Sequence, residues 1–199
     1  MQTFRVQIDR IIVVCPTFRI QETYDPMRKL VMENDIYSEL NKDDFKNLFN
    51  QIKRQQTKKK NAGERYQRIL ILVDDMAGTN MIHGSRFSPF ANLSIQSPHW
   101  NISMIVVTQQ PTNVSPSFRD NAEGLIVFPS EGKLEVEWLK KSYESVCMAE
   151  GQLVELLRHA WRGGISGNSE WGKHFLFIQS LPRRRSRFWL DFEHEIHHE

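Results

Sequence analysis

The sequence predicts an α/β fold in which a mostly parallel sheet is flanked by helices. Two observations predict it. Short continuous apolar runs recur along the chain, and each stops at a polar residue or a proline, which is typical of strands buried on both faces. Segments with apolar residues at helical spacing lie between several of these runs. No apolar run approaches the ~20 residues that a membrane-spanning helix needs, so we expect no membrane partner.

The first half of the chain is expected to contain two strands and two helices. The first strand covers residues 11–16 and is stopped by proline, and a helix follows from Pro26 through Val31. A second helix is expected to begin at Asp43-Asp44, because acids are favoured in a first helical turn. The apolar face of this helix is formed by Phe45, Leu48, Phe49 and Ile52, and Lys58–Lys60 form its basic end. The next strand is expected at residues 69–74.

The second half of the chain is expected to contain four more strands and one long helix. The expected strands are residues 102–109, 124–129, 174–178 and 188–190. Apolar residues recur at nearly helical spacing from Val146 to Ala160, and Gly163-Gly164 is expected to end that helix. At 199 residues the chain is expected to be one domain, with a core sheet in residues 1–130 and a C-terminal helix and strands in residues 131–199.

Composition limits the partners only weakly. The chain carries 26 basic and 24 acidic residues, a net charge of +2, which neither requires nor excludes a polyanionic partner. The basic runs Lys58–Lys60 and Arg183–Arg185 are either solvated loops or contacts with nucleic-acid phosphates. Cys15 and Cys147 do not make a disulfide framework, and each is expected to be a small core residue. No signal peptide is visible, so we expect an intracellular protein.

A candidate site lies where the apolar run 69–73 ends on two adjacent acids, Asp74 and Asp75. Ligands of α/β folds bind at the carboxyl ends of the strands. In a Walker B arrangement the first acid would hold Mg²⁺ through water, and the second would orient or deprotonate a water that attacks the γ-phosphate of ATP. The alternative is a pair of exposed acids that caps the next helix.

The strand at 102–109 ends on Thr108-Gln109, where a side-chain amide could touch the same phosphate or water. Alternatively, Gln109 is a turn residue before Pro111.

These motifs together carry a resemblance. Val106–Pro116, followed by Phe118–Asn121, resembles the sensor region of the FtsK–HerA ATPases, which are RecA-like P-loop NTPases of the additional-strand class. With Ile69–Asp75 and His99–Ser103 added, the chain resembles the poxvirus-type DNA-packaging ATPases of large DNA viruses, virophages and Polinton-type elements. The resemblance covers roughly residues 8–128 well and the C-terminal third loosely.

The resemblance implies a role for each candidate residue. Asp74 would be the acid at the Mg²⁺ site, Asp75 the general base and Gln109 the polar sensor, with Thr108 beside the nucleotide. Arg119 would stabilise transition-state charge, within a subunit or across a ring interface.

Two of the matched positions stay open. Arg119 is alternatively a structural ion pair, with Asp120 or elsewhere. The family often shows an Arg-His pair before the Asn-Ile-Ser stretch, whereas this chain departs from that pattern with Pro98-His99-Trp100.

The resemblance also implies cofactors and partners. The cofactors would be ATP and Mg²⁺, and the partners double-stranded DNA, a homo-oligomeric ring and a capsid protein. The protein would work in the cytoplasm or viral factory of the host cell, or in association with the virion. Its function would be that of an ATP-driven motor that translocates double-stranded viral or mobile-element DNA into capsids. The alternative is a catalytically inactive remnant, or a binding or assembly module, with the same fold.

The phosphate-cradling loop of such ATPases, Gly-x-x-x-x-Gly-Lys-Ser/Thr, does not precede the strand at 11–16. Gly167–His174 has the spacing but ends in His and leads into a strand, so we interpret it as a coincidence. In the family this loop follows a strand that lies between the sensor strand and the one resembling Leu125–Phe128. Its removal would divide the sheet in two and leave backbone groups unpaired on two apolar strands.

We therefore expect the working protein to extend upstream of Met1. The 199 residues alone are expected to fold marginally and to hydrolyse ATP weakly or not at all.

Overall fold

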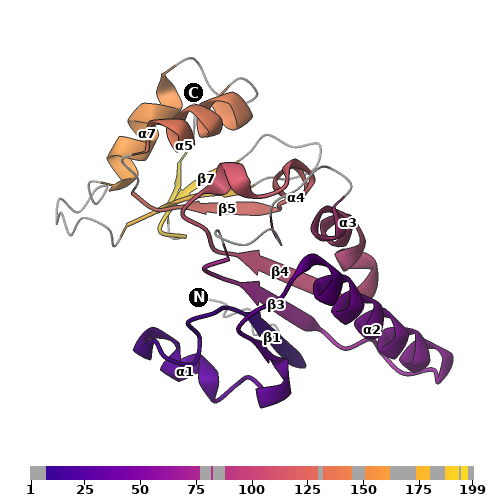
Figure 1. The fold of residues 1–199 in the computed structure, drawn as a ribbon. Helices are drawn as coiled ribbons and strands as arrows, with labels where there is room; N and C mark the ends of the chain where they lie inside the picture. Colours follow the sequence, from indigo (N-terminus) through magenta and orange to yellow (C-terminus); the bar gives the residue numbers. More distant parts are fainter. Residues whose placement is uncertain are drawn as a thin grey trace. The chain divides into compact units, whose positions relative to one another are not determined.

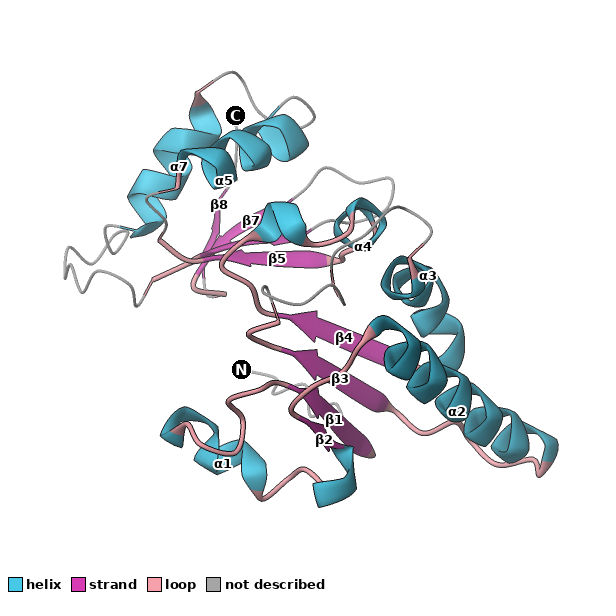
Figure 2. Cartoon of the chain, in the orientation of Figure 1, coloured by secondary structure: helices cyan, strands magenta, loops and turns pink. Residues whose placement is uncertain are grey.

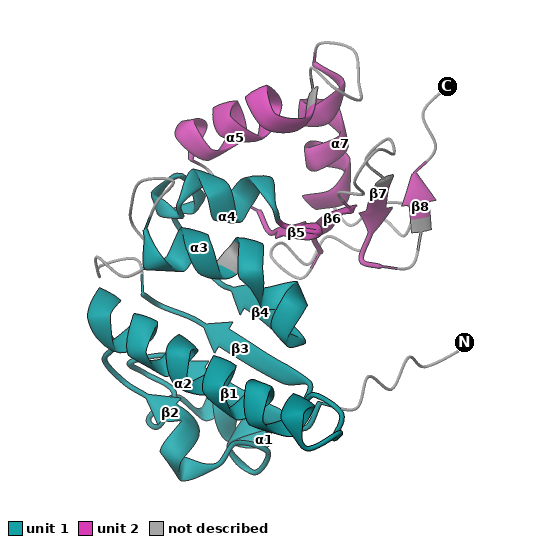
Figure 3. Cartoon of the chain, turned by 90° about the vertical axis from the view of Figure 1, so that its right-hand side faces the viewer, with its two compact units in different colours: residues 1–121 teal, residues 122–199 magenta. Residues whose placement is uncertain are grey.

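The chain forms two compact units, residues 1–121 and 122–199 (Figure 3). The structure is a computed structural model. The residues that it describes are 8–76, 82, 88–129, 132–144, 151–161, 174–179, 187–192 and 194–196. Each unit has its own four-stranded sheet and its own apolar core, and the first combines a parallel sheet with helices (Figure 2). The predicted α/β class is confirmed.

The first unit is built on a fully parallel sheet with the strand order β2-β1-β3-β4 (Figure 1). Its strands are β1 (Arg10–Val14), β2 (Ile36–Tyr37), β3 (Ile69–Val73) and β4 (Ile102–Val106). Three of them were expected, and each ends one to three residues before the end of its expected range. The two-residue strand β2 was not expected, because it is too short to show a periodic pattern.

One face of this sheet is covered by α2 (Lys42–Asn61). The side chain of Asn41 caps this helix, since its oxygen accepts the backbone N–H groups of Asp43 and Asp44 at 2.9 Å. The predicted helix start at these acids is confirmed, and the basic run Lys58–Lys60 forms its last turn.

Beside α2 lies α3 (Pro89–Gln96), which is not among the helices expected from the sequence. Ser88 caps it by accepting the N–H of Ala91 at 3.1 Å, and Pro89 occupies the first turn. The Ser-Pro pair is therefore a helix start, a signal that the sequence analysis did not use.

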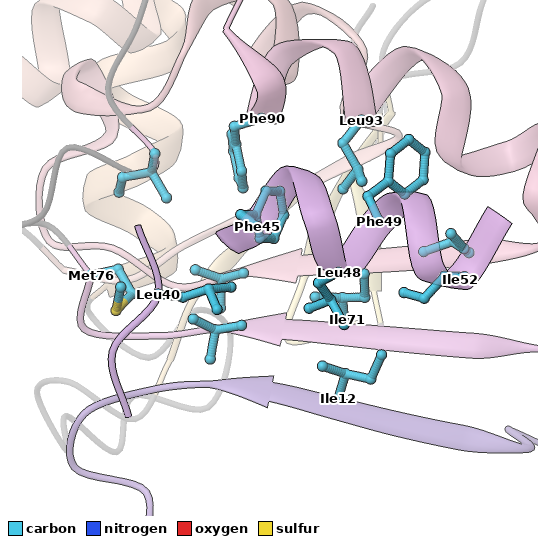
Figure 4. Close-up of a cluster of buried hydrophobic side chains, with 14 of the residues drawn as sticks. Ile12, Leu40, Phe45, Leu48, Phe49, Ile52, Ile71, Met76, Phe90 and Leu93 are labelled. Atoms are coloured by element: carbon cyan, nitrogen blue, oxygen red, sulfur yellow. The ribbon is translucent and has the colours of Figure 1, made fainter. Parts of the chain in front are cut away.

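The main core fills the space between the sheet, α2 and α3. Phe45, Leu48, Phe49 and Ile52 of α2 are all buried in this core, as their spacing predicted, and Phe45 and Phe49 lie beside Phe90 and Leu93 of α3 (Figure 4). Their partners in this cluster include Ile12, Ile71, Met76, Phe90 and Leu93.

Short elements cover the opposite face over β1 and β3. They are η1 (Glu22–Tyr24), α1 (Asp25–Arg28) and η2 (Glu33–Asp35). The helix expected at 26–31 is thus shorter than predicted. A second cluster of Val13, Cys15, Phe18, Val31 and Leu72 is buried there. Cys15 is a buried core residue, as expected, whereas Cys147 lies outside the described residues.

On that face β4 is uncovered. Ile105 is 49% exposed and Val107 is 47% exposed, although both belong to an apolar run that predicted burial on both faces. Within the described residues, β4 pairs only with β3 and forms the edge of its sheet.

The second unit is an antiparallel sheet, β5-β6-β7-β8, with helices beside it. The expected strands at 124–129, 174–178 and 188–190 are present. The strands are β5 (Gly124–Val127), β6 (Leu176–Gln179), β7 (Arg187–Leu190) and β8 (His194–Ile196). The helical elements are α5 (Lys133–Leu139), the π-helical turn η5 (Lys140–Glu144) and α7 (Gln152–Trp161), which contains the described part of the long C-terminal helix that the sequence predicted.

β5 was expected as part of the core sheet of residues 1–130, and the structure places it at the edge of the antiparallel sheet. Leu125 and Val127 pack on the core of this unit, whereas Ile126 and Phe128 are 46% and 55% exposed. A Cβ atom on Gly124 would lie 2.6 Å from the Phe177 ring, so this close approach requires glycine.

Hydrogen bonds from the Gln56 side chain connect α2 to the segments that lead into β3 and β4. Its side chain is fully buried, and its Nε2 donates to the carbonyl oxygens of Gln67 at 2.8 Å and Trp100 at 2.9 Å. Its Oε1 accepts the N–H of Gln67 at 3.1 Å.

Replacing Gln56 with Leu removes these bonds and leaves buried backbone groups unpaired. We expect Gln56→Leu to lower the free energy of unfolding by about 2 kcal/mol, measured by urea denaturation. The exposed Gln51 on the same helix supplies the control, since Gln51→Leu should change stability by less than about 0.5 kcal/mol. Equal losses in the two variants would contradict the anchoring role of Gln56.

Asp9 connects the start of β1 to the segment before β3. Its carboxylate accepts two bonds from the Arg65 guanidinium and one from the N–H of Arg68, all at 2.8 Å. These hydrogen bonds, that from Arg65 first, lower the pKa of Asp9 from 3.8 to about 2.

Because the folded pKa of Asp9 lies below its unfolded value, its contribution to stability is present above pH ~4 and is lost as the pH falls toward about 2. We expect the stability difference between wild type and Asp9→Asn to be constant near neutral pH and to shrink across that window, measured by urea denaturation at each pH. A difference that is the same at both ends of the window would contradict this assignment.

Candidate functional site

The carboxyl ends of β1, β3 and β4 form one edge of the parallel sheet. Val73 lies beside Val14 on one side and Val106 on the other. The ladder extends one residue further, since Asp74 N–H donates to the Val14 carbonyl at 3.0 Å and Val107 N–H to the Val73 carbonyl at 2.8 Å.

The next side chains along these two strands therefore emerge at the same edge. They are Asp74 and Asp75 after β3 and Thr108 and Gln109 after β4, the four residues that the sequence singled out. The parallel register, rather than any direct contact between these side chains, brings them together.

Asp74 is half-buried, and its Oδ2 accepts a hydrogen bond from the hydroxyl of Tyr24 on η1. Burial, together with the hydrogen bonds to Asp74 and Cys15, raises the pKa of Tyr24, which therefore stays a protonated donor at neutral pH. The Cys15 thiol donates to the Tyr24 oxygen at 3.7 Å and lies 3.4 Å from Oγ1 of Thr17.

Sequence reasoning missed Tyr24. It lies 50 positions before Asp74, and only the pairing of β1 with β3 brings the two together. Nothing in the local pattern around Tyr24 marks it as a partner of a carboxylate.

Asp75 is exposed and has a backbone φ of 56°. Asp tolerates this left-handed conformation better than most residues, and here it turns the chain away at the end of β3. The next residue, Met76, is buried in the main core, and this burial anchors the chain directly after the turn. The Asp75 side chain itself is exposed to solvent.

Thr108 and Gln109 begin the loop after β4. Oγ1 of Thr108 accepts the N–H of Gln110 at 3.0 Å, which fixes the turn, and the Asn113 side chain donates to that of Gln110. Gln109 itself is exposed at the edge of the sheet. The loop then enters η4 (Pro111–Asn113), consistent with the turn expected before Pro111.

Arg119 comes from the helical layer. It lies on α4 (Pro116–Asp120), where it is half-buried. The neighbouring Phe118 packs against the main core and stacks on Phe90 of α3, with the ring centroids 5.0 Å apart.

The described residues contain no cluster of three or more His, Cys, Asp or Glu side chains that could hold a metal ion by itself. Asp74 and Asp75 supply two carboxylates at the edge of the sheet. Mg²⁺ characteristically binds through one or two carboxylates together with waters and substrate phosphates, so these residues suit it without a larger cluster.

Other sequence features fall outside this site. Gly167–Lys173 and Arg183–Arg185 lie outside the described residues. In the part of the chain that the structure covers, no helix is both long enough and apolar enough to span a membrane.

No protein-family model and no curated protein matches the sequence. Solved structures do match the fold. The DNA-packaging ATPase B204 from Sulfolobus Turreted Icosahedral Virus gives a TM-score of 0.54 at 14% identity, over 92% of this chain and 82% of that one. The genome packaging NTPase B204 from Sulfolobus turreted icosahedral virus 2 in complex with ATP-gammaS gives 0.55 at 14% identity, over 92% and 81%. Its complex with AMP gives 0.54 at 15% identity, over 85% and 77%.

The chain has the fold of these viral packaging ATPases. The packaging-ATPase fold agrees with the α/β P-loop NTPase class that the sequence predicted.

The contact between Tyr24 and Asp74 can be tested through stability. Tyr24→Phe removes a hydrogen bond to a carboxylate and keeps the ring, so we expect the free energy of unfolding to fall by about 1.5–3 kcal/mol in urea denaturation. Tyr66→Phe is the matched control, because the Tyr66 hydroxyl makes no hydrogen bond within the described chain and should lose less than about 0.5 kcal/mol. A loss of the same size in both variants would show that the Tyr24 hydroxyl does not support Asp74.

Proposed function

We propose that this chain is the part of a DNA-packaging ATPase that binds Mg²⁺ and activates water, in a motor that moves double-stranded DNA into a capsid. The observation that carries the proposal is the alignment of Asp74-Asp75 with Thr108-Gln109 at the carboxyl edge of a parallel sheet. The shared fold supports it, since B204 structures contain AMP, AMPPCP and ATP-gammaS. We propose ATP as the ligand here.

Asp74 suits a Mg²⁺ ion bound through water. Its Oδ2 already accepts a hydrogen bond from the Tyr24 hydroxyl, which holds the carboxylate in one orientation, and the other oxygen would be available to a hydrated ion. Mg²⁺ usually keeps several waters and gains charge neutralisation from a nearby carboxylate, which fits a single oriented acid.

Asp75 is the proposed general base. It directly follows Asp74, and it is exposed at the edge where a γ-phosphate would lie. There it can accept a hydrogen bond from the attacking water and take up its proton.

The other candidates act on the phosphate. The Gln109 side-chain amide would hydrogen-bond the γ-phosphate or the attacking water. The turn fixed by Thr108 sets the position of the backbone from which this side chain extends. Arg119 would neutralise the charge of the transition state in its own subunit or in a neighbour of a homo-oligomeric ring. The ring and a capsid protein as docking partner remain part of the proposal.

The exposed residues of this site need a further segment that shields them from bulk water. Phosphoryl transfer is fastest where water is excluded, yet Asp75 and Gln109 are both exposed. β4 is an edge strand with exposed Ile105 and Val107, and it can accept a further parallel strand. We propose that a phosphate-binding loop on such a strand, from a longer reading frame or a second polypeptide, completes the site.

The test is ATP hydrolysis by the full native reading frame and its Asp75→Asn variant. General-base catalysis contributes about 100-fold or more, so kcat should fall by at least that factor while Mg²⁺-dependent ATP binding persists. Asp43→Asn is the control, because Asp43 is an exposed acid at the start of α2 and its loss should leave kcat unchanged.

Unchanged kcat in Asp75→Asn would overturn the assignment of the base. A full reading frame that neither hydrolyses ATP nor gains thermal stability from Mg²⁺ and ATP would favour a catalytically inactive assembly module.

A further inference from the structure

The C-terminal half of α2 and Trp100 line an open groove of about 650 Å³. Five of its six lining residues carry polar or basic side chains, and the sixth is a tryptophan. The lining residues are Asn50, Lys53, Arg54, Thr57, Lys58 and Trp100.

The groove has a concentrated positive charge. Between Asn50 and Asn61 the chain carries five basic residues and no acid, although its net charge is only +2. Lys59 pairs with Glu64 at 2.8 Å, whereas no carboxylate pairs with Lys53, Arg54 or Lys58 in the described parts of the chain.

Three exposed cations and one exposed amide form a row along the surface of the helix. Lys46, Asn50, Arg54 and Lys58 lie at successive intervals of four residues, and all four are exposed. Each interval advances about 6 Å along the helix, so the row presents regularly spaced donors.

The floor of the groove is held in place. Lys53 Nζ lies 5.5 Å from the centroid of the Trp100 ring and 5.2 Å from that of Phe49, and it donates to Oε1 of Gln96 at 3.0 Å. The buried Gln56 holds the Trp100 carbonyl. Because these groups are already ordered, a ligand would lose little side-chain entropy on binding here.

The groove is separate from the candidate nucleotide site. Gln56 binds the carbonyls of Gln67 and Trp100, which directly precede β3 and β4, so this half of α2 lies at the amino ends of the strands. Asp74 and Asp75 lie at the carboxyl ends of the same sheet.

We infer that this groove binds the phosphate backbone of double-stranded DNA, and this inference rests on the proposed packaging function. Lys, Arg, Asn and Thr are among the side chains that contact DNA phosphates, and a row of basic and amide donors along the helix suits a polyanion. None of the exposed large hydrophobic residues lies on α2, so the surface lacks the side chains that would insert into a lipid bilayer. The groove contributes position and affinity rather than base recognition.

The experiment measures binding of a fluorescein-labelled DNA duplex by fluorescence anisotropy at two salt concentrations, without nucleotide. Arg54→Gln/Lys58→Gln should weaken binding about tenfold, and the slope of log K against log salt should become less negative by about 2. Lys133→Gln/Lys141→Gln removes the same charge from two exposed positions of the second unit and should change neither quantity. Circular dichroism of both variants checks that the fold is intact.

Equal affinity losses in the two double variants, or an unchanged salt slope in the α2 variant, would overturn the inference. So would poly-glutamate that competes as well as unlabelled duplex, since the groove would then be a general site for acidic polymers. Asp75→Asn should leave DNA binding unchanged. Failure of the ATPase proposal therefore appears in hydrolysis alone, and failure of the groove appears in DNA binding alone.

Discussion

The parallel pairing of β1, β3 and β4 is the constraint on which the rest of the first unit depends. It places Val14, Val73 and Val106 side by side, and every polar residue that follows these strands emerges at one edge. Shifting the register by one residue would turn the apolar side chains of a strand from one face to the other and separate Asp74 from its position beside Val107. The apolar packing of α2 on these strands and the hydrogen bonds of Gln56 both preserve this register.

The parallel arrangement of the strands also places acidic and basic side chains at opposite ends of the sheet. Carboxylates and a side-chain amide gather at the carboxyl ends of the strands, whereas the basic half of α2 lies at their amino ends. Acidic oxygens suit a hydrated cation, and basic donors suit a polyanion. This separation keeps the carboxylates, which would repel DNA phosphates, away from the proposed DNA-binding groove.

Strong local patterns were enough to predict much of this from the sequence. The strands β1, β3 and β4 were recognised because each is a continuous apolar run, and α2 because its apolar residues recur at helical spacing. The helix α3 was missed because its signal is a Ser-Pro cap rather than a long apolar face. Tyr24 could not be found, since its partner is 50 positions away and the contact exists only after the strands pair.

The edge strands β4 and β5 are less buried than the sequence predicted. The runs of β4 and β5 predicted burial on both faces, yet each strand lies at the edge of its own sheet with apolar side chains exposed. The expectation that a missing central strand would leave two apolar strands unpaired stays a prediction. The exposed positions, Ile105 and Val107 among them, are where a completing strand would gain most burial.

The most direct test of the central claim is a crystal structure of the full reading frame with AMPPCP and Mn²⁺ in place of Mg²⁺. The account predicts an anomalous peak beside the Asp74 carboxylate, bridged by water, with the terminal phosphonate facing Asp75 and Gln109. A nucleotide bound elsewhere, for example stacked on Trp100 in the basic groove of α2, would contradict it.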